Sequence, residues 1–271
     1  MSSFLLLALL AGPAAAAGVE DARPRALRDI GFDQRLGERV PGELAFRDDA
    51  GREVRLGDYL AGGKPVVLSL NYYACPMLCT VTLNGLAGAM KAISMDAGRE
   101  FQVLTVSFDA TETPALAAEK KKQYLERYGR PTAAAGWHFL TGDQASIDAL
   151  TKAVGFRYAW DAETRQWAHP AGIIVLTPDG RIARYLYGIE YAPRDLRLAL
   201  VEAASGRIGN VVDQAILFCY KYDPTTGRYG AAIMRVVRTG GVVTVIALAT
   251  FILAMLRRER AAAASQAAGG N

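Results

Sequence analysis

Two cysteines four positions apart carry the strongest chemical signal in the chain. Cys75 and Cys79 lie between an apolar run, residues 66–71, and a stretch whose apolar positions recur at helical spacing. Side chains four apart on a helical turn face the same way, about 5–6 Å apart between Cβ atoms. The amino end of a helix favours thiolate over thiol, and thiolate is both a nucleophile and a metal ligand. The pair therefore predicts a redox dithiol or part of a soft-metal site.

A further ligand would be an imidazole, and the chain contains only two histidines. His138 stands inside an expected strand, residues 137–141, where a structural or edge role is the simpler interpretation. His169 follows a polar stretch, residues 161–166, and directly precedes Pro170. We expect His169 at a loop tip beside a sheet edge, against the cysteine loop.

The residue types available favour copper among the metals. Two thiolates and one imidazole in a three-coordinate arrangement suit Cu(I) and also accept Cu(II). Zinc would prefer a fourth ligand, and none is evident in the sequence. We therefore expect a copper site formed by Cys75, Cys79 and His169.

The elements that would position these residues alternate between strands and helices. The pattern predicts a hairpin over residues 44–56, then strands at 66–71, 101–108 and 137–141, then a hairpin over 171–187. Helices are expected after Cys79 and over residues 113–128, 144–154 and 193–204. A parallel start that ends in an antiparallel hairpin and a helix is the order of a thioredoxin-like α/β sandwich, here with an N-terminal β-hairpin extension.

Composition excludes several other classes of protein. The chain has 271 residues, which suits one or two domains, and 31 basic against 27 acidic side chains give a net charge of +4. So small a net charge does not indicate a nucleic-acid-binding surface, and no nucleic-acid partner is expected. Three cysteines cannot form a multi-disulfide scaffold, and two histidines exclude a site of three imidazoles.

Both ends of the chain are apolar. Residues 1–17 are interpreted as a signal peptide, with a disordered alanine-rich leader as the alternative. Residues 240–256 carry no charge and are followed by Arg257, Arg258 and Arg260, which predicts a transmembrane helix with a cytoplasmic tail. A buried C-terminal helix is the alternative. The body would lie on the periplasmic side of the cytoplasmic membrane, held by a single span.

The expected organisation follows from these segments. A signal peptide (1–17) and an extended lead-in (18–40) precede the thioredoxin-like copper-binding domain (41–206). A membrane-proximal connector (207–238), a transmembrane helix (239–257) and a cytoplasmic tail (258–271) complete the chain.

Several ordered motifs give the chain a family resemblance. These are Cys75-Pro76-x-x-Cys79 after a strand, Ser107-Phe108-Asp109 with Thr113-Pro114 downstream, Trp137-His138-Phe139-Leu140-Thr141-Gly142, and His169 ahead of residues 173–180. Over about residues 40 to 205 the chain resembles the Sco/SenC family of membrane-tethered, thioredoxin-like copper chaperones. In that family two cysteines and a late histidine bind copper, which corresponds to Cys75, Cys79 and His169 here.

The resemblance implies a function in the assembly of cytochrome c oxidase. A copper-binding chaperone of this kind would act on the copper-bearing oxidase subunit, at its binuclear copper centre, and receive metal from a copper donor protein. It would be a metallochaperone, not an enzyme with a small-molecule substrate. The alternative is a thiol-disulfide oxidoreductase that reduces cysteines of an oxidase subunit, with Cys75 and Cys79 as the redox pair. A peroxidase would leave His169 unexplained, and a purely structural disulfide in so small a loop would stabilise little.

Two features depart from the family pattern, and Asp109 within the matching motifs has an expected role of its own. The family commonly has Asp two residues after the first cysteine, where this chain has Met77, interpreted as a packing residue. The expected anchor is C-terminal, whereas the family anchor is usually N-terminal. Asp109 is expected to cap or brace the cysteine loop.

Cys219 lies between the body and the expected span, outside the resemblance. Its simplest interpretation is a small buried thiol. The functional alternative is a third thiol that accepts copper or resolves a disulfide at the Cys75/Cys79 pair.

Overall fold

The computed structural model describes residues 30–75, 78–209, 222–223, 228–229 and 231–268. The chain divides into two compact units, and the boundary in the sequence lies between Gly209 and Asn210. The expected signal peptide lies outside the described residues, as do Met77 and Cys219.

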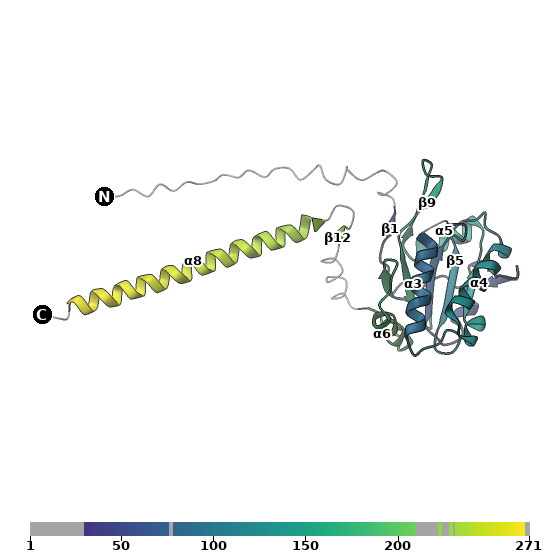
Figure 1. The fold of residues 1–271 in the computed structure, drawn as a ribbon, viewed down its shortest axis with the longest axis horizontal. Coiled ribbons are helices and arrows are strands. Elements are labelled where there is room, and N and C mark those ends of the chain that lie inside the picture. Colours follow the sequence, from purple (N-terminus) through teal and green to yellow (C-terminus); the bar gives the residue numbers. More distant parts are fainter. Residues whose placement is uncertain (1–29, 76–77, 210–221, 224–227, 230, 269–271) are drawn as a thin grey trace. The chain divides into compact units, whose positions relative to one another are not determined.

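A five-stranded sheet forms the centre of the first unit, in the order β11-β10-β4-β5-β6 (Figure 1). The strands β4 (Val66–Asn71), β5 (Gln102–Ser107) and β6 (Trp137–Leu140) run parallel. They are joined by the antiparallel strands β10 (Gly172–Leu176) and β11 (Ile182–Tyr187). The predicted mixed α/β order, with a parallel start and an antiparallel end, is confirmed.

Helices cover both faces of this sheet. One face packs against α3 (Leu78–Ala92), α4 (Pro114–Tyr128) and α6 (Pro193–Ala204). The other face packs against α5 (Gln144–Ala153) and the short α2 (Leu56–Leu60). The sheet that positions Cys75 and His169 is therefore packed against helices on both faces.

Smaller strands complete the unit in three pairs. The predicted N-terminal hairpin is formed by β2 (Ala45–Arg47) and β3 (Glu53–Arg55). A second pair joins β1 (Gly31–Phe32) to β7 (Phe156–Arg157), and a third joins β8 (Ala159–Asp161) to β9 (Gln166–Ala168). A 3₁₀ turn, η2 (Pro131–Ala135), precedes β6.

The burial of β4 explains its almost unbroken apolar sequence. All six of its residues are buried, with Val67 in the core beside α3 and Leu68 in the core on the opposite face. A parallel strand that is covered on both faces has no side exposed to solvent, so its sequence does not alternate between apolar and polar residues. The chain must leave such a strand at its carboxyl end, and Cys75 follows there.

The ends of α4 follow local sequence signals. The side chain of Thr113 accepts a hydrogen bond from the amide of Leu116, and Pro114 occupies the first helical turn. Gly129 ends the helix with φ 70°, a left-handed conformation that glycine adopts without a Cβ clash. The predicted helix over residues 113–128 is confirmed in position.

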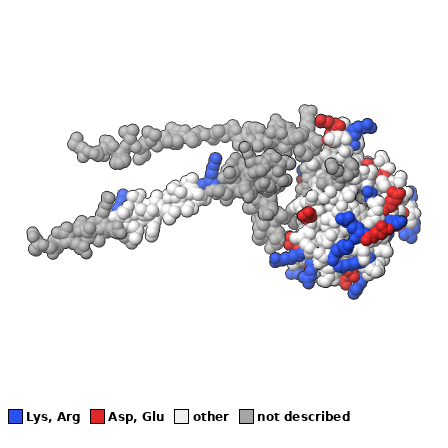
Figure 2. All heavy atoms as spheres, viewed as in Figure 1, with Lys and Arg blue, Asp and Glu red and all other residues white. Residues whose placement is uncertain are grey.

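The second unit consists mainly of one long helix, α8 (Ala231–Ala268), preceded by the short pair β12 (Tyr222–Asp223) and β13 (Arg228–Tyr229). Within α8, the segment Arg238–Arg257 has 20 residues and a mean hydropathy of 2.2. Figure 2 shows this segment as an uncharged stretch with a basic group at each end. By length and composition it is able to cross a membrane.

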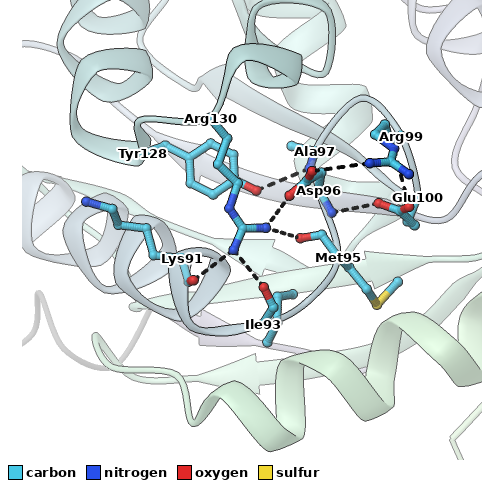
Figure 3. Close-up of polar contacts among 9 residues, drawn as sticks. All are labelled: Lys91, Ile93, Met95, Asp96, Ala97, Arg99, Glu100, Tyr128 and Arg130. Carbon is cyan, nitrogen blue, oxygen red and sulfur yellow. Dashed lines mark hydrogen bonds and ion pairs between the residues drawn. The ribbon is translucent and has the colours of Figure 1, made fainter.

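Arg130 closes the carboxyl end of α3 (Figure 3). Its guanidinium also pairs with Asp96 and lies 5.4 Å from the ring centre of Tyr128. It donates to three main-chain carbonyl oxygens at and beyond the end of the helix, those of Lys91, Ile93 and Met95, at 2.8, 2.7 and 2.9 Å. The last carbonyls of a helix lack partners within the helix, and a cation there also suits the helix dipole.

We expect Arg130→Met to lower the free energy of unfolding by about 3 kcal/mol, because it leaves an aspartate and three carbonyl groups without their donor. The matched control is Arg127→Met, which removes an exposed cation from the last turn of α4, shortly before Arg130. This change should alter stability by less than about 0.5 kcal/mol. Chemical denaturation of the full chain measures both values. Equal stability of the two variants would contradict this role for Arg130.

Candidate metal site

The cysteine loop leaves the sheet at the carboxyl end of β4. Cys75 is 7% exposed, and its amide donates to the carbonyl of Tyr72 at 3.3 Å, which closes a tight turn. The hydroxyl of Tyr73 is shared between the carbonyl oxygens of Thr105 and Leu140, at 2.9 and 2.8 Å. Burial raises the pKa of Tyr73 well above its ordinary value, so the hydroxyl remains a neutral donor. Tyr73 is thereby fixed to β5 and to the last residue of β6.

Glu112 holds the same loop from the other side. Its carboxylate accepts the amides of Tyr73 and Ala74 at 2.8 and 2.6 Å, and the hydroxyl of Ser107 at 2.6 Å. Burial raises the pKa of Glu112, and the three hydrogen bonds offset only part of that effect. A partly buried carboxylate with three donors is a rigid support for the backbone that precedes Cys75.

His169 is buried, with 6% of its surface exposed. Its Nδ1 lies 3.1 Å from the carbonyl oxygen of Pro170. Because a carbonyl can only accept, this bond selects the tautomer with the proton on Nδ1 and the lone pair on Nε2. An imidazole in this form is suited to bind a metal through Nε2.

Aromatic rings place His169 against the cluster that buries Cys75. The imidazole packs edge-on against Tyr72 and Phe108, at ring-centre distances of 5.9 and 5.2 Å, and Phe156 lies 6.3 Å away. These three aromatic residues and Cys75 belong to one apolar cluster. The structure therefore brings the predicted thiol and the predicted imidazole to the same core at the carboxyl end of β4.

Cys79 lies in the first turn of α3, and its side chain is outside the described part of the structure, as are residues 76–77. Among the described residues, no three side chains of His, Cys, Asp or Glu gather closely enough to hold a metal ion. The three-residue set of Cys75, Cys79 and His169 therefore stays a prediction.

The expected position of His169 at a loop tip was wrong. The polar stretch before it forms the turn of the β8–β9 hairpin, and His169 follows β9 directly into the core. Asp161 shapes that turn by accepting the amide of Glu163 and the hydroxyl of Thr164. The alternation of Tyr158 and Trp160 ahead of Asp161 was a signal for this hairpin.

Asp109 has a different position from the one expected. Its carboxylate accepts the indole N–H of Trp167 at 3.0 Å, and the amide and hydroxyl of Thr111 at 2.9 and 2.6 Å. Although burial acts to raise it, the hydrogen bonds from Thr111 and Trp167 hold the pKa of Asp109 below its ordinary value. Asp109 thus supports the strand that leads to His169, and Glu112, which the sequence did not single out, supports the described part of the cysteine loop.

His138 lies apart from these residues on the edge strand β6, as its structural interpretation predicts. Its ring contacts Tyr59 at 4.5 Å, and its Nε2 lies 3.2 Å from the side-chain oxygen of Gln102. Burial, together with the nearby charge of Lys121, lowers the pKa of His138 to about 4. It therefore stays neutral at physiological pH.

The sheet order, with a cysteine directly after the central parallel strand and an antiparallel hairpin at the end, defines a thioredoxin-like α/β protein. The SCO1/SenC family model matches residues 33–203, and the chain belongs to this family. No curated protein matches the chain at a significant level.

The chain is also similar to a number of solved structures. A candidate electron transfer protein of Aquifex aeolicus VF5 is 28% identical, with a TM-score of 0.56 over 64% of this chain and 96% of that one. ScoI of Arabidopsis thaliana, solved with copper bound, is 20% identical, with a TM-score of 0.50 over 62% and 99%. BsSco, a member of the Sco family of cytochrome c oxidase assembly proteins, is 18% identical, with a TM-score of 0.48 over 64% and 98%.

The low pKa of His138 predicts a pH dependence of stability. Its ordinary pKa is 6.5 and its pKa in the folded chain is about 4, so the unfolded chain binds the proton first as the pH falls. The free energy of unfolding should decrease by roughly 3 kcal/mol between about pH 7 and pH 4. The variant His138→Gln cannot bind this proton, and its stability should fall less over that range. Denaturation at several pH values measures both slopes, and identical slopes would refute the assignment.

Proposed function

We propose that this protein is a membrane-tethered copper chaperone that binds one copper ion through Cys75, Cys79 and His169. Its cargo would go to the binuclear copper centre in the copper-bearing subunit of cytochrome c oxidase. Family membership supports this proposal, because the resemblance implies these three ligands and this partner. A copper donor protein is the second partner that it requires.

The observation that carries the proposal is the burial of His169 against the aromatic cluster that contains Cys75. A neutral imidazole with its lone pair on Nε2 is a ligand form, and a thiolate is the soft donor that Cu(I) prefers. Both groups are buried, which limits their access to water. Three donors leave room for an incoming ligand, which is what a protein that gives up its metal needs.

The thioredoxin-like position of Cys75 favours a second candidate, a thiol-disulfide oxidoreductase for the same oxidase subunit. In that reaction Cys75 and Cys79 would give two electrons and two protons to a partner disulfide. The partner would be left with two thiols, and a disulfide would form between Cys75 and Cys79. His169 discriminates the two functions, because copper binding needs its imidazole and disulfide exchange does not.

The C-terminal helix supports the proposed tether. At about 1.5 Å per residue, the 20 residues from Arg238 to Arg257 reach about 30 Å, the thickness of a bilayer core. Arg257, Arg258 and Arg260 follow one another closely at one end. By the positive-inside rule these arginines would be cytoplasmic, and the copper-binding domain would lie on the periplasmic side of the cytoplasmic membrane.

Copper titration tests the proposed ligands. The reduced full-length chain, titrated with Cu(I) in competition with a chelator, should bind one copper ion. Cys75→Ser and Cys79→Ser should each weaken binding by at least about 100-fold, more than the loss of a group that only orients a ligand. His169→Ala should weaken Cu(II) binding more than Cu(I) binding, because a two-thiolate chelate remains for the softer ion.

The control for the histidine is His138→Gln, which should bind both oxidation states like the unaltered chain. If His169→Ala also binds both like the unaltered chain, His169 is no ligand. Retained disulfide exchange in that variant would then favour the oxidoreductase.

The proposed topology has its own test. A reporter that is active only after export should be inactive when fused after Asn271 and active when fused near Gly209. The reason is that the arginine cluster holds the carboxyl end in the cytoplasm. Activity of the fusion after Asn271 would overturn the orientation.

A further inference from the structure

Two consecutive peptide groups leave β4 immediately before Cys75, and one carboxylate receives both. The amides of Tyr73 and Ala74 donate to separate oxygens of Glu112, Oε2 and Oε1, at 2.8 and 2.6 Å. The hydroxyl of Ser107 donates to Oε2 at 2.6 Å. Both oxygens of Glu112 are therefore used in the support of one short segment.

The neighbouring strand explains why this contact is available. In the parallel register of β4 and β5, Asn71 lies opposite Ser107, so the two strands end side by side. Beyond Asn71 the chain turns away from the ladder, and the amides that follow need acceptors other than a strand. Hydrogen bonds to a carboxylate are about twice as strong as bonds between neutral groups, so Glu112 is a strong acceptor for both amides.

We propose that Glu112 is the positioning residue of the metal site, and that it sets the backbone from which the Cys75 thiolate would reach the metal. The inference rests on the proposed function only in that Cys75 is taken as a ligand. The carboxylate of Glu112 bonds to the main chain that precedes Cys75. It acts through Tyr73 and Ala74, whose peptide planes determine where Cys75 begins.

A second carboxylate on the same segment supports the opposite side of the site. Asp109 accepts the indole N–H of Trp167, two residues before His169. The turn between β5 and α4 thus holds both segments that carry the described candidate ligands, one through Glu112 and one through Asp109. A change at Glu112 should disturb the cysteine segment and leave the histidine segment in place.

The variant Glu112→Gln tests the hydrogen bonds of the carboxylate without a large change in side-chain volume. Glutamine has nearly the same volume, but its amide nitrogen cannot accept, so one of the two main-chain amides loses its partner. We expect the Cu(I) affinity of the full-length reduced chain to fall at least tenfold. Hydrogen exchange of the peptide that contains Tyr73 and Ala74 should become at least tenfold faster, and exchange of the peptide that contains Trp167 should stay the same.

The matched control is Glu126→Gln, which removes an exposed carboxylate from α4 and should change neither readout. A second variant, Ser107→Ala, removes the donor that orients the carboxylate but keeps both acceptors. It should give a smaller loss of Cu(I) affinity than Glu112→Gln. Equal losses in both variants would mean that the hydroxyl itself carries the effect.

The two readouts separate this inference from the proposed function. If the unaltered chain binds no copper, the proposed function fails, and the exchange of the loop amides still tests whether Glu112 holds them. If the Glu112→Gln variant shows the hydrogen exchange and the copper affinity of the unaltered chain, Glu112 is not the positioning residue. Faster exchange throughout the chain would show general destabilisation and would equally overturn it.

Discussion

The carboxylate of Glu112 accepts two successive peptide amides where the chain leaves the central strand, and this contact supports the segment that leads to Cys75. The sheet makes the contact geometrically available, because parallel neighbours end at the same edge and Ser107 lies opposite Asn71. The two apolar cores hold the sheet, and Arg130 holds the far end of the helix that begins at the site. The environment of Cys75 thus depends on packing throughout the domain and on one charged group at its edge.

Most of the fold was predictable because its signals are local. An almost unbroken apolar run predicted the bounds of β4. Thr113 and Gly129 marked the ends of α4, and the amphipathic pattern predicted the range of α6. The site was less predictable, because its contacts join residues far apart in the chain. No local sequence pattern around Glu112 predicts that its carboxylate accepts a hydrogen bond from an amide 38 positions earlier in the chain. The β8–β9 hairpin was missed because its strands are only three residues long and its turn uses Arg165 at φ 54°.

The two histidines show how surroundings decide what an imidazole does. Both are largely removed from water, yet His138 lies beside Gln102 and within the field of Lys121, on an edge strand. His169 instead bonds through Nδ1 to the next carbonyl and faces aromatic rings. The first arrangement suits a neutral structural group. The second places a buried imidazole with its lone pair on Nε2 beside the cluster that contains Cys75, as the proposed ligand role requires.

Tyr73 adds a mechanical property to this arrangement. Its hydroxyl is shared between carbonyl groups of two different strands, β5 and β6, so the base of the cysteine loop is fastened across the sheet. The segment from Tyr72 to Cys75, fastened in this way, would keep its shape whether or not a cargo is present, and the entropy of ordering that segment would be lost during folding and not during binding. Cargo would then leave by substitution, as a stronger donor approaches from outside, while the protein itself stays closed. The rate of release would be set by the partner's ligands and would vary little with the stiffness of the carrier.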